Sequence, residues 1–179
     1  MRILGVIGIL WVSTTMAAER FDPETGLRIN HYTEATPKSV PGAQTINVDQ
    51  AHELWLQDAL FVDVLSITVG RYDELDGFWP EDTPVRESIP NSIWLPNVGF
   101  GRPDQDMQDY LMSNVLDRAQ AGDPIVVFCI DSCWMGWNAT QHLANAGYSN
   151  VHWFPQGTDD WERAGYPLVV VDPIPVDVD

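Results

Sequence analysis

The residues of this sequence best suited to chemistry are its only two cysteines, Cys129 and Cys133. They follow a short apolar run, 125–128, that is typical of a buried β-strand, and they precede a stretch with a helical pattern. In open α/β sheets this corner, where a strand hands over to a helix, is the ordinary place for chemistry. The pair could therefore serve as a catalytic site, a redox site, a metal site or a structural disulfide.

Spacing and neighbours favour a redox-active or regulatory pair among these alternatives. A helix N-terminus stabilises a thiolate, and two thiols four positions apart can close a small ring. A ring this small constrains the unfolded chain only modestly, which weakens a purely structural purpose. No histidine lies near the pair, zinc usually takes four ligands, and the C-x-x-C-H pattern of covalent haem attachment is absent. We predict no metal site.

Short apolar runs alternate with helical patterns along the chain, which predicts an α/β fold with a parallel sheet of about five short strands flanked by helices. The expected strands are 45–48, 60–65, 92–95, 125–128 and 151–154, and residues 168–171 either add a strand or lie extended. The expected helices are 50–57 capped by Asp49, 104–121, 134–146 and 159–164 capped by Thr158.

Three residues outside the cysteine loop are candidates for supporting the site. Asp63 interrupts an apolar strand, so it is either a structural hydrogen-bond anchor or a catalytic carboxylate. Residues 66–87 form a long acidic loop, in which Trp79 either covers a site as a lid or packs the loop onto the body of the protein. Arg71 and Arg86 are rare cations in this loop and are expected to pair with its surroundings.

Composition limits the partners. The 179 residues carry a formal net charge of -17 with 45% hydrophobic residues, which predicts a folded, acidic protein without a nucleic-acid partner. A neutral small molecule or a basic protein is more compatible. We expect a monomer.

The first 18 residues have the features of an export signal. Arg2 precedes an apolar run, 3–12, and cleavage is expected near Ala17 or Ala18, which would place the protein in the periplasm. The run is too short to cross a bilayer, which takes about 20 residues, so no stable membrane span is expected; an uncleaved interfacial anchor is the alternative. Residues 19–43 are expected to form an extended arm that contacts the domain, 44–172 the domain, and 173–179 a solvated acidic tail. The arm's expected contact residues are Phe21, Leu27, Ile29 and Tyr32.

Four motifs stand in the order found in rhodanese-like domains: LFVDVL at 60–65, SIPNSIWLP at 88–96, IVVFC at 125–129, and NVHWFPQGTDDWERAGYPL at 150–168. The sequence resembles that family from residue 45 to about 168. More narrowly, CIDSCWMGWNA, SIWLPNVG, the Pro-Val-Arg-Glu stretch at 84–87 and PQGTDDWERAGYPL resemble the rhodanese-like proteins named for a cysteine-pair-plus-Trp (CXXCW) motif and associated with PQQ-dependent alcohol catabolism. The resemblance implies an exported accessory protein of methanol or ethanol oxidation. A quinoprotein alcohol dehydrogenase or a cytochrome c would be its partner, and PQQ would belong to the pathway and would not be bound here.

In rhodanese-like enzymes a cysteine at the position of Cys129 carries a persulfide, held by backbone N–H groups and an arginine a few residues on. This sequence has Met135 where the arginine would fall, and no Arg or Lys from Cys129 to Tyr148. A dianionic substrate needs cationic donors, and Asp131 adds a negative charge instead. Phosphatase chemistry is therefore disfavoured, and thiosulfate sulfurtransfer is weakened. Three roles stay open: thiol–disulfide chemistry, persulfide transfer, and a non-catalytic binding module for a dehydrogenase or cytochrome c.

The residues around the cysteines are expected to contact a substrate or partner. Trp134 and Trp137 lie three apart and share a helix face, where they form either an aromatic wall for a partner or part of the core; we expect one to be packed and the other exposed. Asn138 is expected to hydrogen-bond the loop backbone. The full set of loop contact residues is Ile130, Asp131, Ser132, Trp134, Met135, Trp137 and Asn138.

Overall fold

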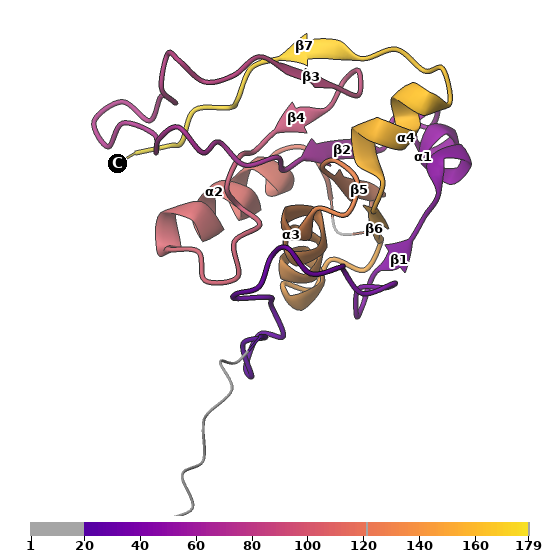
Figure 1. Cartoon of the computed structure of the whole chain (residues 1–179), viewed down its shortest axis with the longest axis horizontal. Helices are drawn as coiled ribbons and strands as arrows, with labels where there is room; N and C mark the ends of the chain where they lie inside the picture. The colour runs from indigo at the N-terminus through magenta and orange to yellow at the C-terminus, as the bar shows by residue number, and fades with distance from the viewer. Residues whose placement is uncertain (1–19, 121, 179) are drawn as a thin grey trace, which may run out of the picture.

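The computed structural model describes residues 20–120 and 122–178. Five parallel strands form a central sheet in the order β1-β6-β5-β2-β4 (Figure 1). The strands are β1 (Gln44–Thr45), β2 (Leu60–Asp63), β4 (Ile93–Trp94), β5 (Ile125–Phe128) and β6 (Val151–Phe154). The helices are α1 (Val48–Trp55), α2 (Gln105–Leu116), α3 (Trp134–Asn145) and α4 (Gly157–Arg163). The predicted fold class, a parallel sheet flanked by helices, is confirmed.

Alternating side chains of the central strands fill two cores, one on each face of the sheet. Val62 and Val127 point toward α2 and α3, whereas Phe61, Val126 and Phe128 pack with α1 and α4. All four residues of β5 are fully buried, as expected for a central parallel strand covered on both faces. Because β5 is packed on both faces, the position of its last residue is fixed, and with it the position of Cys129.

Two helix caps differ from the sequence-based expectation. Helix α1 is capped by Asn47 and not by Asp49, because Asn47 and Gln50 each bond the other's backbone N–H at 3.0 Å in a capping box. Helix α4 begins at Gly157, and Thr158 is not its cap, since the Thr158 N–H donates to the Cys129 carbonyl. Helix α2 begins at Gln105, one residue after the expected start, with Asp104 as its N-cap, and it ends at Leu116 and not at 121.

The segments 66–87 and 173–178 are more ordered than expected. Strand β3 (Arg86–Ser88), which lies at the end of the long acidic loop, pairs antiparallel with β7 (Val169–Val171). The expectation of a solvated tail is wrong for residues 173–178: the Ile174 N–H donates to the Trp94 carbonyl, and Val176 is buried. Burial of Val176 and the backbone hydrogen bonds of the tail therefore outweigh the preference of its aspartates for solvent.

The expected export segment, Met1 to Ala18, lies outside the described residues. Within residues 20–120 and 122–178, the helices are all too short or too polar to traverse a bilayer.

Gly77 provides a test of the contact between the acidic loop and the tail. Its φ is +74°, and a Cβ there would overlap the Val176 carbonyl oxygen. The Val176 N–H also donates to the Gly77 carbonyl at 2.8 Å. Gly122 has a similar φ of +101° but open space around it. We predict that Gly122→Ala costs about 1 kcal/mol, and that Gly77→Ala costs about 1–3 kcal/mol more, in chemical denaturation. Equal losses would mean that the contact with the tail is unimportant.

Candidate functional site

Cys129 and Cys133 are joined by a disulfide, with their Cα atoms 6.1 Å apart. Cys129 directly follows β5, and Cys133 occupies the N-cap position of α3, where it makes no side-chain capping hydrogen bond. The pair thus closes the loop that joins the central strand to the helix behind it. No free cysteine remains, so in this state neither sulfur can act as a nucleophile or carry a persulfide.

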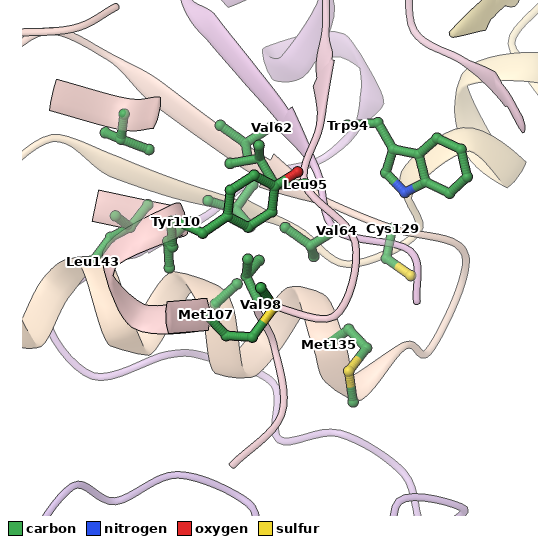
Figure 2. Close-up of a cluster of buried hydrophobic side chains, with 14 of the residues drawn as sticks. Val62, Val64, Trp94, Leu95, Val98, Met107, Tyr110, Cys129, Met135 and Leu143 are labelled. Carbon is green, nitrogen blue, oxygen red and sulfur yellow. The ribbon is translucent and has the colours of Figure 1, made fainter. Parts of the chain in front are cut away.

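The two halves of the disulfide differ in their access to solvent. Cys129 is only 2% exposed and belongs to the core between the sheet and α3, where Figure 2 shows it at the margin of the cluster with Trp94 and Met135. Cys133 is half-buried. The residues between them, 130–132, are exposed, and Ser132 adopts a left-handed φ of +58°. A reagent from solvent therefore meets Cys133 before Cys129.

The first turn of α4 holds the backbone of Cys129 from behind. The Thr158 N–H donates to the Cys129 carbonyl at 3.1 Å. Gly157 has a φ of +50°, and a Cβ there would overlap the same carbonyl oxygen, so only glycine permits this approach. Sequence reasoning placed neither residue in the site, although both lie in the PQGTDD motif.

Asp63 and Arg86 form a buried ion pair beneath the loop. Arg86 Nε donates to Asp63 Oδ2 at 2.7 Å, and the Ser88 hydroxyl donates to the same oxygen at 2.5 Å. The other carboxylate oxygen accepts the Leu65 N–H at 3.0 Å. Burial raises the pKa of the Asp63 carboxyl, and the adjacent guanidinium opposes that shift. Asp63 is fully buried with both oxygens bonded, which is the geometry of a structural hydrogen-bond anchor.

The same arginine also reaches the disulfide loop. Arg86 Nη2 donates to the Cys129 carbonyl at 3.5 Å and to the Thr158 hydroxyl at 3.4 Å. The guanidinium therefore links β2, β3, the cysteine loop and α4 through one side chain. It bonds the backbone of the loop from the inside, so it is not positioned as the missing substrate-binding arginine would be.

The loop offers little to an anion. The Asp131 N–H, one of the backbone donors that an anion would need, is bonded to the Asp159 carboxylate at 2.7 Å. Asp131 accepts a further hydrogen bond from the Ser132 hydroxyl, and Met135 is buried at the position of the missing arginine. Asp159 was not singled out from the sequence, and it adds to the local negative charge. In residues 20–120 and 122–178, no group of three or more His, Cys, Asp and Glu side chains is arranged to hold a metal ion.

The aromatic face of α3 is covered by the N-terminal arm. Trp134 and Trp137 are each 3% exposed, so the expectation that one of them is exposed is wrong. The Trp134 indole N–H donates to the Glu34 carbonyl, and that of Trp137 donates to the Ser39 carbonyl at 3.0 Å. The guanidinium of Arg28 lies 4.6 Å from the Trp134 ring centroid, a cation–π contact. The arm thus satisfies the polar atoms of both indoles and occupies the wall that a partner would use.

Asn138 also belongs to the arm interface and not to the loop backbone. Its side-chain amide accepts the Arg28 N–H at 2.8 Å and donates to the carbonyls of Arg28 and Gly99, each at 2.9 Å. Arg28 itself is 3% exposed and pairs with Glu34 at 2.7 Å. Sequence reasoning missed Arg28, because a single cation in an irregular segment gives no periodic signal of burial.

Trp79 packs the acidic loop onto the domain. It is 8% exposed, its indole N–H donates to the Ile174 carbonyl at 2.9 Å, and its ring contacts Tyr72 and Tyr110. Of the two interpretations of this residue, the geometry matches the one in which it fixes the loop and not the one in which it is a lid.

Comparisons with known proteins give one family match and similar solved structures. The family model described as "Rhodanese-like domain" matches residues 51–164, more than half of the chain. A polysulfide-sulfur transferase from Wolinella succinogenes, a 30 kDa homodimer, superposes with a TM-score of 0.46 and 16% identity, covering 72% of this chain and 79% of that one. A thiosulfate sulfurtransferase from Pseudomonas aeruginosa gives a TM-score of 0.48 and 18% identity, covering 76% of this chain and 22% of that one. A search of curated proteins gave no match.

The buried pair beneath the loop yields a stability prediction. Arg86→Met leaves the Asp63 carboxylate buried without its cation, and we expect a loss of about 3–5 kcal/mol in the free energy of unfolding. Arg71→Met, which removes exposed ion pairs with Asp104 and Asp106, should cost no more than about 1 kcal/mol. Adding Asp63→Asn to Arg86→Met should recover part of the loss. Additive losses in this double-mutant cycle would contradict direct coupling of the two charges.

Proposed function

Because the chain belongs to the rhodanese-like domain family, we propose that it exchanges its Cys129–Cys133 disulfide with a dithiol of another protein. The observation that carries this proposal is the disulfide itself, closed across the family's strand-to-helix corner with one sulfur buried and the other half-buried. A ring between residues four apart stabilises the fold by only about 2 kcal/mol in the chain-entropy view. Its chemical reactivity is therefore the better reason for its presence.

The exchange has a defined direction across the pair. A thiolate of the partner attacks the Cys133 sulfur, the S–S bond breaks, and its electron pair leaves with the Cys129 sulfur. A second thiolate of the same partner then attacks the partner's own sulfur in the mixed disulfide and releases Cys133 as a thiolate. The partner dithiol is oxidised to a disulfide, and the Cys129–Cys133 pair is reduced to two thiols.

The helix behind the loop supports the release step. Cys133 is the N-cap residue of α3, and its side chain makes no capping bond while it is held in the disulfide. Once released, a thiolate at this position can accept the free N–H groups of the first helical turn. Reduction therefore gives α3 a cap that the oxidised state lacks.

Persulfide transfer is the second candidate, and it rests on the position of Cys129 directly after β5 in this family's fold. It requires that the disulfide first be reduced. The charge around the loop argues against thiosulfate or another dianion as the sulfur donor, since the Asp131 N–H is engaged by Asp159 and no Arg or Lys lies between Cys129 and Tyr148.

We place this activity in the periplasm, in support of PQQ-dependent oxidation of methanol or ethanol. The support for this setting is the sequence resemblance to CXXCW proteins and the export features of the first 18 residues. A quinoprotein alcohol dehydrogenase or a cytochrome c would then be the client whose thiols are oxidised or whose disulfides are exchanged.

The asymmetry of the pair is testable with single substitutions. Reduced Cys129→Ser keeps the accessible thiol of Cys133, and we expect it to form a mixed disulfide with glutathione disulfide at least about tenfold faster than reduced Cys133→Ser, whose thiol is buried. Mass spectrometry of quenched samples measures both rates. Equal rates, or a faster reaction at Cys129, would contradict attack at Cys133.

Two controls accompany that measurement. The far-ultraviolet circular dichroism of both variants should match that of the wild type, which shows that the fold survives each serine. The reduced wild type, supplied with thiosulfate and cyanide, should produce no more thiocyanate than the double variant Cys129→Ser/Cys133→Ser. Cysteine-dependent thiocyanate formation would instead favour the persulfide role.

The biological setting has a separate test. A host strain whose own copy is replaced by Cys129→Ser/Cys133→Ser should grow more slowly on methanol or ethanol than the wild type, and normally on a carbon source that needs no alcohol oxidation. Immunoblotting confirms equal amounts of the protein. Full growth of the double variant on the alcohol would rule out a cysteine-dependent role in that pathway.

A further inference from the structure

Exposed apolar side chains are concentrated on one part of the surface. Of the eleven exposed large apolar side chains in the described part of the chain, six lie in the segment 69–85 or in β7. Phe78, Val85 and Val170 are 61%, 78% and 63% exposed. These three line one groove of about 460 Å³, whose other walls include Pro80, Pro84 and Trp94. We call it the β3–β7 groove. Apolar side chains gathered in this way are typical of an interaction surface.

The groove is built on a fixed frame. The β3–β7 ladder forms one wall, and the C-terminal segment, which runs beside the acidic loop in Figure 1, ties down the other. The Trp79 indole donates to the Ile174 carbonyl at 2.9 Å, and the Val176 N–H donates to the Gly77 carbonyl at 2.8 Å. A preformed apolar groove loses little conformational entropy when a partner binds.

Two acidic residues, Glu81 and Asp172, line the groove, and the acidic loop that forms part of it carries further exposed acids. Residues 66–87 carry six Asp or Glu and two Arg, and all six acidic residues are exposed. None of the six forms an ion pair in the described part of the chain. Both cations are engaged elsewhere, since Arg86 points inward to Asp63 and Arg71 pairs with Asp104 and Asp106. The apolar floor is thus flanked by the exposed carboxylates of Glu81 and Asp172, neither of which forms an ion pair in the described part of the chain.

We propose that the β3–β7 groove docks a segment of another protein that carries Lys or Arg side chains around an apolar centre. Charge complementarity selects this occupant, because its cations would neutralise these carboxylates while its apolar side chains cover Phe78, Val85 and Val170. A second copy of this chain would bring a second set of carboxylates against the first, and the net charge of -17 opposes that contact.

The groove is connected to the disulfide loop. Arg86 lines the groove and also donates to the Cys129 carbonyl, so a partner seated there rests on the same side chain that supports the loop. The docking proposal does not depend on disulfide exchange, since its test uses binding alone.

The test uses the full chain without its export segment and three synthetic peptides of equal length. One alternates Lys and Leu, one alternates Lys and Ser, and one alternates Glu and Leu. We expect measurable binding of the Lys/Leu peptide by fluorescence anisotropy, about tenfold weaker binding of the Lys/Ser peptide, and none of the Glu/Leu peptide. Amide hydrogen exchange should show protection by the Lys/Leu peptide in residues 74–88 and 169–173. Protection confined to other segments would overturn the proposal.

Matched variants separate the groove from the overall charge. Groove variant Glu81→Gln/Asp82→Asn/Glu87→Gln/Asp172→Asn, which removes both lining acids and two exposed acids beside them in sequence, should bind the Lys/Leu peptide about tenfold more weakly. A control removes four exposed acids elsewhere, Glu24→Gln/Glu53→Gln/Asp58→Asn/Asp117→Asn, and should bind within about twofold of the wild type. Phe78→Ser should weaken binding of the Lys/Leu peptide but not of the Lys/Ser peptide. Equal losses in the two quadruple variants, or concentration-dependent self-association through the groove in sedimentation equilibrium, would overturn the proposal.

Discussion

The structure depends on how the buried Asp63 carboxylate is satisfied. A charge at the end of a fully covered strand is costly unless it is paired and hydrogen-bonded, and here it receives a guanidinium, a hydroxyl and a backbone N–H. The guanidinium arrives on β3, which brings the end of the long acidic loop back to the sheet. Its second nitrogen bonds the Cys129 carbonyl and the Thr158 hydroxyl. One ion pair thereby fixes the cysteine loop relative to β2, β3 and α4.

This arrangement keeps the strand, loop and helix of a rhodanese-like site, but the charges of the loop suit a different kind of binding partner. The strand, the loop and the helix N-terminus are in the places that suit a sulfur nucleophile. The charges are not suited to an anion, because Asp131 and Asp159 supply negative charge where a cation would be needed. Here Cys129 is bonded instead to the second cysteine, Cys133. The fold alone therefore does not decide what this site binds, and the side chains of the loop do.

The central elements were predictable because their sequence signal is local. The run 125–128 is apolar throughout, and its strand and the following helix could be placed from composition and periodicity alone. The packing of residues 66–87 could not be predicted, because it depends on hydrogen bonds with Ile174 and Val176, which lie about a hundred positions away in sequence. The burial of both indoles of α3 was missed for the same reason. Their partners, the carbonyls of Glu34 and Ser39, lie in an irregular segment whose polarity suggests solvent. Local capping could have been recognised, as the Asn47 to Gln50 spacing shows.

The arm has a consequence for the order in which the molecule assembles. Arg28 and Asn138 are separated by 110 residues along the sequence, and the hydrogen bonds of Trp134 and Trp137 to the arm have similar sequence separations. Contacts of such long sequence separation carry a larger loop-closure entropy than local ones, so we expect the arm to dock after α3 has formed. Until then the two indoles on α3 have no acceptor, and the aromatic face beside the cysteines is open to solvent. The arm therefore controls access to the aromatic face of α3 next to the cysteine loop, and a state of the protein with the arm detached would expose both indoles there.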